Sequence, residues 1–456
     1  SLNLIFLLMD STLCGTLRYA IFQSNLHSGA VSRWAISSQI YGAEPYIVFD
    51  ALLTTFLSER KAMDEKRQYR HQGLTICTLG GVGHGKTMLA AGIIKVVSRI
   101  GSTQMTADDF ESQQPIHHSI GPQTYASHKA VDYETSGRHY THIDGMSHGD
   151  NVKMLIGGSP GIRGAILVVS AVDGVTTEAE AEIRLASQVR IPTVVTFLNK
   201  AEKVKDPELI EICEMEIREI LTNCGYVEEE SPIIVGDAEK ACNYKGQNLN
   251  SDHWKPIVDL IFAMNRCMPQ PLNPLELPLL MPIRKVIDNP KGTSALYGGA
   301  VQGGLAVGHP VDVVGKGDRI KTRCVGLRHG DVAESTEDEV QVDAEMGWIT
   351  PGQVVSQPKS IKSHTEFEAV VYVMTQEECG THIPLVGNDK PEIHLWTIDV
   401  TGHLHLPSEV AIVNPGEHAT VRISLDVPMA LTVGTRFEIK KMEARIGMGI
   451  VTEIIE

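Results

Sequence analysis

The sequence predicts an α/β domain, with a mostly parallel sheet and helices on both faces, followed by two antiparallel β-barrel domains. Two observations predict this order. Between residues 71 and 268, short apolar runs alternate with stretches of helical periodicity, which is typical of a parallel sheet. Beyond residue 278, short β-like runs are separated by turns that contain glycine or proline, which is typical of antiparallel barrels.

The first domain, residues 71–268, is predicted from three strands and three helices. The run GAILVVSA is continuously apolar, which indicates a strand buried on both faces. In chain order the predicted elements are the strand Leu74–Leu79, the helix Met88–Ile100, the strand Gly164–Ala171, the helix Glu178–Val189, the strand Pro192–Leu198 and the helix Pro207–Leu221. The second helix is predicted to bury Ala181, Ile183, Leu185, Ala186 and Val189, and the third Leu209, Cys213, Ile217 and Ile220.

A linker at residues 267–278 ends this pattern. It has four prolines in twelve residues, which cannot continue a helix and favour an extended chain. Two β domains are predicted from this linker onward, at residues 269–360 and 361–456, with SIKSHTEF at their boundary. Their clearest strand-like runs are Val311–Val314, Gln353–Ser356, Phe367–Met374, Ile393–Val400, Ala419–Ser424 and Gly447–Ile455.

Composition narrows the class of protein. The chain has 456 residues with a formal net charge of −16, which argues against a surface coated in basic charge but leaves a local basic patch open. Its eight cysteines are scattered without a C-x-x-C pair, which favours free thiols in a reducing compartment. No run approaches the roughly 20 apolar residues that a membrane helix needs, so we expect no membrane association.

Residues 1–70 are predicted to be a leader. The stretch from residue 11 to residue 43 contains two arginines and many serines but no acidic residue, a composition that resembles a transit peptide. We therefore expect a degraded organelle-targeting segment and a mitochondrial location. A leader without a targeting role, with a cytoplasmic location, is the alternative.

The sequence LGGVGHGKTML carries the strongest motif. Gly80, Gly85, Lys86 and Thr87 form the G-x-x-x-x-G-K-[ST] pattern, directly after a strand and before a helix. Such a loop binds phosphates through backbone N–H groups and the positive end of the helix dipole. Lys86 would reach the β- and γ-phosphates, and the Thr87 hydroxyl would bind Mg²⁺. The other candidate nucleotide contacts in this loop are Gly83 and His84.

Segments in a fixed order carry a family resemblance. GGVGHGKT, GRHYTHIDGMSHGDNVKMLIGG, GAILVVSAVDG, FLNKAE and EMEIREILTNCGY follow one another as in elongation factor Tu, and the mitochondrial form is most similar. Similar segments continue through SHTEFEAVVYVMTQEECGTHIP, TIDVTGHLHLP and VNPGEHATVRISLDVPMAL to GTRFEI. The resemblance covers residues 66–456. It implies a GTPase domain and two β-barrels that bind GTP or GDP with Mg²⁺ and carry aminoacyl-tRNA to the ribosome, with a nucleotide exchange factor similar to elongation factor Ts as a further partner.

The resemblance implies a second switch at DGMSHGDNVK. Asp144 would hold Mg²⁺ through water, and His148 would position the attacking water. Ser147 stands where the family has a glycine whose peptide reorients on hydrolysis, so we expect reorientation to be hindered. A loop histidine without a catalytic role is the alternative for His148. The first switch departs further. Thr124 is its only nearby candidate for the metal-binding threonine, and an ordinary polar loop is the favoured alternative.

The resemblance also implies a guanine-reading turn at FLNKAE. Asn199 would hydrogen-bond the base and the loop, Lys200 would pack along the ring, and Glu202 stands where the family has Asp. Glu202 keeps the charge but displaces it by about 1.5 Å, and a misplaced charged hydrogen bond costs on the order of ten- to a hundred-fold in affinity. In the next element, GDAEKA, the N–H of Ala238 would meet guanine O6, while Asp237 replaces a serine and brings negative charge near the base.

The β domains depart from the family at two places. Thr381 replaces an arginine that would face tRNA. The second domain is shortened around residues 326–347, where six acidic residues gather: Glu334, Glu337, Asp338, Glu339, Asp343 and Glu345. We therefore expect tRNA binding to be weaker than in the family.

Three readings of the sequence remain open. The first is an active translational GTPase. The second is a non-catalytic or decayed descendant, favoured by the departures at Ser147, Glu202, Asp237, the first switch and Gly83, which stands where the family has Asp. An ATPase is the weakest of the three, because Asn199 and Lys200 stand where guanine recognition belongs.

Overall fold

The structure is a computed structural model. It describes residues 73–455 except for 101, 102, 104, 121, 122, 136, 137, 146, 158–160, 272–275, 290–292, 329–337, 345 and 346. The predicted leader at residues 1–70 lies outside the described residues. Within them, no helix is long and apolar enough to cross a membrane.

The first domain is built on a seven-stranded sheet in the order β2-β3-β4-β1-β5-β6-β7. Strands β4, β1, β5, β6 and β7 pair in parallel, while β2 and β3 add an antiparallel edge. The strands are β1 (Leu74–Leu79), β2 (Ile116–Ile120), β3 (Gln123–Thr135), β4 (Arg138–Gly145), β5 (Ile162–Ser170), β6 (Val194–Asn199) and β7 (Ile233–Val235). The central strands are apolar throughout because helices cover both faces.

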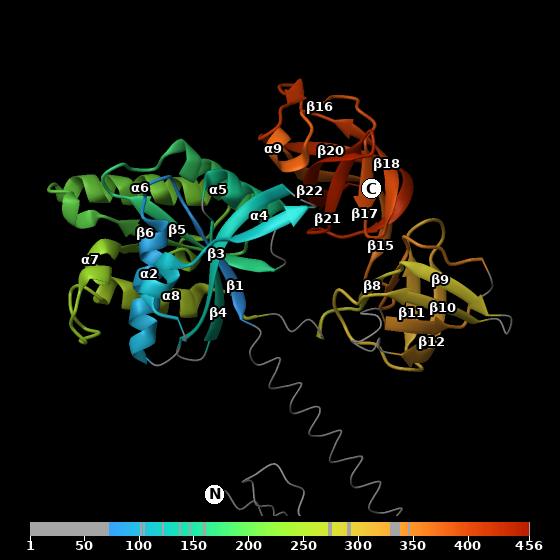
Figure 1. Ribbon diagram of the computed structural model, residues 1–456, viewed down its shortest axis with the longest axis horizontal. Helices are drawn as coiled ribbons and strands as arrows, with labels where there is room; N and C mark the ends of the chain where they lie inside the picture. The colour runs from blue at the N-terminus through green and yellow to red at the C-terminus, as the bar shows by residue number, and fades with distance from the viewer. Residues whose placement is uncertain are drawn as a thin grey trace, which may run out of the picture. The chain divides into compact units, whose positions relative to one another are not determined.

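Two hydrophobic cores lie on opposite faces of this sheet (Figure 1). One core is covered by α2 (Lys86–Ile100), α3 (Ala107–Ser112), α7 (Ala238–Asn243) and α8 (Lys255–Cys267), with Trp254 fully buried in it. The other is covered by α4 (His148–Gly157), α5 (Thr177–Gln188) and α6 (Pro207–Asn223). Short 3₁₀ turns lie at Ala201–Lys203 and Glu228–Glu230.

The predicted buried faces of two helices need correction. In α6, Leu209 is exposed and Leu221 is buried in its place, because Leu209 lies in the first turn, before the helix reaches the core. In α5, Ala181 is only partly buried, while Glu182 is fully buried between Ala179 and Ile183. A helix face follows the i, i+3, i+4 positions whatever residue type occupies them.

The second domain is a half-barrel of seven antiparallel strands in the order β8-β14-β11-β12-β13-β10-β9. The strands are β8 (Leu280–Pro282), β9 (Lys285–Asn289), β10 (Thr293–Gly298), β11 (Pro310–Val314), β12 (Ile320–Arg328), β13 (Asp338–Val342) and β14 (Val354–Ser356). Of the predicted acidic residues, Asp338 and Glu339 lie on β13 and Asp343 follows it. Glu334, Glu337 and Glu345 lie outside the described residues.

The third domain is a closed barrel of β15, β20, β18, β17, β21 and β22. Its elements are β15 (Lys362–Val373), α9 (Gln376–Cys379), β16 (Leu385–Val386), β17 (Glu392–Leu395), β18 (Ile398–His405), β19 (Ile412–Val413), β20 (His418–Leu431), β21 (Arg436–Lys441) and β22 (Ala444–Ile454). Thr381 follows α9, and its hydroxyl lies 3.2 Å from the sulfur of Cys379.

The three sheets confirm the predicted fold class, an α/β domain followed by two antiparallel β domains. The domain boundaries at residues 71–268, 269–360 and 361–456 stay predictions.

The single strand predicted at residues 393–400 is wrong. These residues form a hairpin, in which Ile393 on β17 faces Val400 on β18. The turn is made by Trp396, whose backbone is left-handed with φ 57° and whose indole N–H donates to the carbonyl of Ala430 at 2.7 Å. These residues contain no glycine or asparagine, the residue types that usually mark a hairpin turn. The sequence pattern therefore predicted one continuous strand.

Candidate active site

The candidate site lies where the parallel strands of the first sheet end. Such carboxyl edges are where open α/β sheets bind ligands. The phosphate loop follows β1, and Asp144 is the penultimate residue of β4. Asn199 ends β6, and Ala238 begins the helix after β7. The topology therefore brings together residues that are up to 158 positions apart in the chain.

The phosphate loop needs its glycines for two different reasons. Gly80, Gly83 and Gly85 all have positive φ angles, of 134°, 79° and 93°. A Cβ at Gly80 would lie 2.1 Å from the carbonyl oxygen of Val168, and one at Gly85 would lie 2.4 Å from Asn199 Nδ2. At Gly83 the space is open, so there only the backbone conformation favours glycine.

Lys86 begins α2 and closes over this loop. Its Nζ donates to the carbonyl of Gly80 at 2.7 Å and to that of Gly81 at 3.2 Å. The lysine charge is therefore held at the centre of a loop made of main-chain groups and the first turn of a helix. This is the arrangement that recognises phosphate oxygens.

Thr87 and Asp144 form the candidate metal position. The Thr87 hydroxyl donates to Asp144 Oδ2 at 2.6 Å, and the hydroxyl of Thr78 donates to Asp144 Oδ1. Asp144 is fully buried, and the parallel pairing of β1 with β4 places it opposite Thr78. A hydroxyl and a carboxylate are hard oxygen donors of the kind that Mg²⁺ prefers, so the residues present fit this ion. Thr124, the candidate for the first switch, lies on β3 opposite Ser119.

His84 contributes to the loop mainly through its backbone. Its ring is buried, and its Nδ1 donates to the carbonyl of Val168 at 3.1 Å. Burial lowers the pKa of this imidazole, which keeps it neutral at physiological pH. The His84 carbonyl accepts a hydrogen bond from Asn199 Nδ2 at 2.9 Å.

Asn199 connects two loops at once. Besides the bond to His84, its Oδ1 accepts from the N–H of Ala238 at 2.9 Å, and the side chain is buried. The phosphate loop is thereby fixed to the first turn of α7. Lys200 follows with a left-handed backbone, φ 59°, and its Nζ lies 3.4 Å from Asp173 Oδ2.

Glu202 and Asp237 are both engaged within the protein. Glu202 forms an ion pair with Lys240, and both side chains are nearly half exposed. Asp237 is the N-cap of α7, and its Oδ1 accepts from the N–H of Lys240 at 3.0 Å. The charge that the sequence predicted near the base therefore caps a helix, where a carboxylate is stabilising.

His148 is the first residue of α4, and Ser147 fixes its place. The Ser147 carbonyl accepts from Asn151 N at 3.0 Å, and its hydroxyl accepts from Asp150 N at 3.1 Å. These are the two bonds of an N-cap residue. Ser147 thus stabilises the helix start at the residue where the family has glycine.

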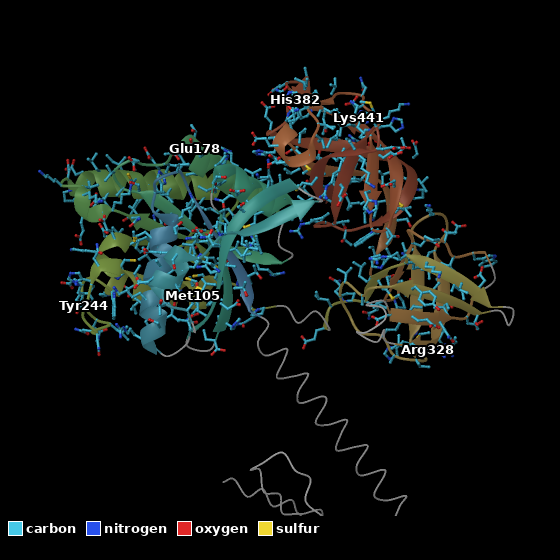
Figure 2. All side chains as sticks on the ribbon, viewed as in Figure 1. Met105, Glu178, Tyr244, Arg328, His382 and Lys441 are labelled. Carbon is cyan, nitrogen blue, oxygen red and sulfur yellow. The ribbon has the colours of Figure 1, made fainter. Side chains whose placement is uncertain are left out.

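Sequence reasoning missed Glu182. Its carboxylate accepts from Nδ1 of His148 at 2.8 Å and from the backbone N–H of Gly80 at 2.7 Å. The hydrogen bond that His148 donates to Glu182 is the largest cause of the raised pKa of His148. An acidic residue at a core position of the α5 periodicity was the signal that could have found it. Glu178, in the first turn of the same helix, is exposed (Figure 2).

Helix α4 also packs on the closed barrel. Lys153 Nζ lies 2.7 Å from Glu378 Oε1, and both side chains are largely buried. Arg436 donates from Nε to the carbonyl of Ile156 at 3.2 Å. The element that carries His148 is therefore anchored to both the first and the third domain.

Comparison with protein families agrees with this arrangement. Residues 71–283 match the model of the elongation factor Tu GTP binding domain, and residues 360–455 match that of the elongation factor Tu C-terminal domain. The two matches lie on one chain, in this order, on the α/β domain and on the closed barrel. The chain therefore belongs to the elongation factor Tu family of translational GTPases.

Proposed function

We propose that this protein is an elongation factor Tu-like GTPase that binds GTP with Mg²⁺, delivers aminoacyl-tRNA to the ribosome and hydrolyses the nucleotide there. The observation that carries the proposal is the convergence of Lys86, Thr87, Asp144 and Asn199 at one edge of the sheet. Asn199 supports guanine recognition because it holds the phosphate loop and the N–H of Ala238 in a fixed relation.

Each residue has a distinct task in this proposal. The loop N–H groups and Lys86 would bind the phosphates, and Thr87 would hold Mg²⁺ directly, while Asp144 would hold it through water. When bound, Mg²⁺ supplies the charge that offsets the negative charge of the triphosphate. His148 holds the attacking water at Nε2, because its Nδ1–H is donated to Glu182.

The base site supports guanine binding of reduced strength. Glu202 offers two acceptor oxygens for the guanine N1–H and N2–H₂, but it is paired with Lys240. Binding of the base therefore competes with an ion pair. The carboxylate of Asp237 is held by Lys240 N and does not compete for the base. The N–H of Ala238, predicted to meet guanine O6, is donated to Asn199 Oδ1 at 2.9 Å, so the base must compete for it.

Partners and location follow from the family and from the leader. Aminoacyl-tRNA, the ribosome and an exchange factor similar to elongation factor Ts are the proposed partners. The mitochondrial location rests on the composition of residues 11–43, with the cytoplasm as the alternative. A fusion of residues 1–70 to a fluorescent protein tests it, since a targeting leader moves the reporter into the organelle.

A non-catalytic descendant is the second candidate function. Two observations favour it, namely the pairing of Glu202 with Lys240 and the capping of α4 by Ser147. In this reading the protein is a scaffold that binds nucleotide weakly or not at all.

Nucleotide titration of the purified chain separates the two functions. GTP, ATP and xanthosine triphosphate are compared with and without Mg²⁺. Saturable, Mg²⁺-dependent GTP binding with ribosome-stimulated turnover that is lost in His148→Ala supports the GTPase. Absence of GTP binding at millimolar concentration supports the scaffold, and a filter-binding assay with charged tRNA tests the delivery role separately.

A further inference from the structure

Glu182 is a fully buried carboxylate between the phosphate loop and the start of α4. Its two oxygens face different elements. Oε2 accepts from the N–H of Gly80 at 2.7 Å, and Oε1 accepts from Nδ1 of His148 at 2.8 Å. Asn151, one turn into α4, donates from Nδ2 to both oxygens at 3.1 Å. One side chain on α5 therefore joins the first residue of the phosphate loop to the second switch.

The cost of burying this carboxylate points to a positional role. An ionised carboxylate without water is stable only if hydrogen-bond donors satisfy it. Here the donors are a backbone N–H, an amide and an imidazole, and no Lys or Arg among the described residues lies within ion-pair distance. The neighbouring buried positions on α5 are Ala179, Ile183 and Ala186, so an apolar side chain would complete this face at lower cost.

We propose that Glu182 is the positioning residue of His148 in GTP hydrolysis. It holds the imidazole at a fixed position relative to the phosphate loop. The inference rests on the proposed GTPase function. It concerns how the histidine is oriented, and Glu182 itself touches neither the nucleotide nor the attacking water.

The hydrogen bond selects one form of the imidazole. Because a carboxylate can only accept, Nδ1 must carry the proton that is donated to Glu182. The lone pair of the neutral ring then lies on Nε2, the nitrogen that can accept a hydrogen from water. The same carboxylate also holds Gly80, so a shift of the phosphate loop is transmitted to the ring through a single side chain.

The charged groups around His148 come from three elements besides its own. Glu182 and Glu178 on α5 raise the pKa of the imidazole, while burial and Lys86 on α2 lower it. The pKa of His418 on β20 is lowered, first by burial and then by the His148 charge. Glu182 has the largest effect, so its removal lowers the pKa of His148.

The test compares Glu182→Gln with Glu180→Gln. The first keeps the shape of the side chain but replaces one acceptor oxygen with an N–H₂ donor. That donor must then face either Gly80 N–H or His148 Nδ1. Glu180 lies two residues earlier on α5 in a partly exposed ion pair with Arg184, so its variant removes the same charge away from His148.

The first measurement is an NMR titration of the His148 ring without nucleotide, assigned by the signal that His148→Ala loses. We expect Glu182→Gln to lower the pKa of His148 and to reduce the fraction of the tautomer protonated at Nδ1, while Glu180→Gln changes neither. Identical titration curves in Glu182→Gln and wild type would overturn the proposal. This measurement needs no GTPase activity, so failure of the proposed function does not affect it.

The second measurement is ribosome-stimulated GTP hydrolysis. We expect Glu182→Gln to lower kcat on the order of 100-fold, the lower end of what a positioned acid–base group contributes, with KM unchanged. The acid limb of the pH profile should move to lower pH. In a His148→Ala background the same substitution should have no further effect, whereas additive losses would overturn the proposal.

A second variant covers the case in which Glu182→Gln does not fold. Glu182→Asp keeps the charge but shortens the side chain by about 1.5 Å, so it cannot reach Gly80 and His148 together. A lowered His148 pKa in this variant supports the proposal, and an unchanged one overturns it.

Discussion

The carboxylate of Glu202 forms an ion pair with the ammonium group of Lys240, and the pair joins the loop after β6 to the first turn of α7. Both segments belong to the base-binding part of the site, because Asn199, the residue directly before the loop, also accepts a hydrogen bond from Ala238 N in the first turn of α7. The carboxylate that would accept the guanine N1–H and N2–H₂ therefore has a competing cation beside it. An exposed pair of this kind is weak, so the base can displace it.

Shortening this side chain should strengthen nucleotide binding. In Glu202→Asp the carboxylate is withdrawn by about 1.5 Å and is restored to the family geometry. We expect GTP affinity to rise on the order of ten- to a hundred-fold. Titration with a fluorescent GTP analogue measures the change. Glu239→Asp is the control, since Glu239 pairs with Lys203 on the neighbouring surface. Equal affinity in Glu202→Asp and wild type would show that Glu202 is not the damaged contact.

Removing the Asn199 side chain should weaken both the fold and the site. Asn199→Ala leaves the His84 carbonyl and the Ala238 N–H without their partner, and each such buried group costs about 1–3 kcal/mol. We expect the free energy of unfolding to fall by at least about 2 kcal/mol, measured by urea denaturation. Asn223→Ala, at an exposed position in the last turn of α6, should change it little. An Asn199→Ala protein as stable as wild type would contradict the bridging role.

The effect of Mg²⁺ on GTP binding should depend on the hydroxyl of Thr87. In Thr87→Ala the hydroxyl that faces Asp144 is lost, whereas Thr87→Ser keeps it. We expect Thr87→Ala to bind GTP equally with and without Mg²⁺, and Thr87→Ser to retain the Mg²⁺ effect. Isothermal titration at several Mg²⁺ concentrations distinguishes them. If both variants keep the full Mg²⁺ effect, Thr87 is not a ligand.

Ser147 should slow the second switch by capping α4. Ser147→Gly removes the hydroxyl that accepts from Asp150 N, and a glycine N-cap costs only a few tenths of a kcal/mol. It also frees the backbone to reorient. We therefore expect near-wild-type stability with faster hydrolysis, measured by single-turnover phosphate release. Ser147→Ala is the matched control, because it loses the cap, at about 1 kcal/mol, without gaining glycine's freedom. Equal rates in the two variants would assign the effect to the cap alone.

The sequence predicted much of the fold because its signals are local. The strand Leu74–Leu79 was placed correctly at both ends, since the apolar run stops at Gly80. The hairpin at Trp396 was missed for the same reason. Its left-handed turn is stabilised by a hydrogen bond to Ala430, which lies 34 residues away, and no local pattern marks it.

The sequence predicted those site residues whose role follows from a local motif. Lys86 and Thr87 were found from a motif, and the structure places them beside the loop carbonyls and Asp144. Glu182 was missed because it acts through contacts with residues 34 and 102 positions away. The ion pair of Glu202 with Lys240 joins residues 38 positions apart. The sequence could therefore show that Glu202 is longer than the Asp of the family, but not that Lys240 is its partner.

The stability of the protein should depend on pH through His148. Its pKa is raised above the ordinary value of 6.5, chiefly by the hydrogen bond to Glu182. A histidine with a raised folded-state pKa contributes stability that is fully present below its unfolded pKa and is lost as pH rises through the folded pKa. The stability advantage of wild type over His148→Asn should therefore be largest below about pH 6.5 and should decline toward alkaline pH. Buried His84, whose pKa is lowered, has the opposite sign, but it is present in both proteins and cancels in the difference. Urea denaturation of the two proteins across this range measures the difference. A difference that does not vary with pH, or one that grows as pH rises, would show that the Glu182–His148 contact does not stabilise the charged imidazole.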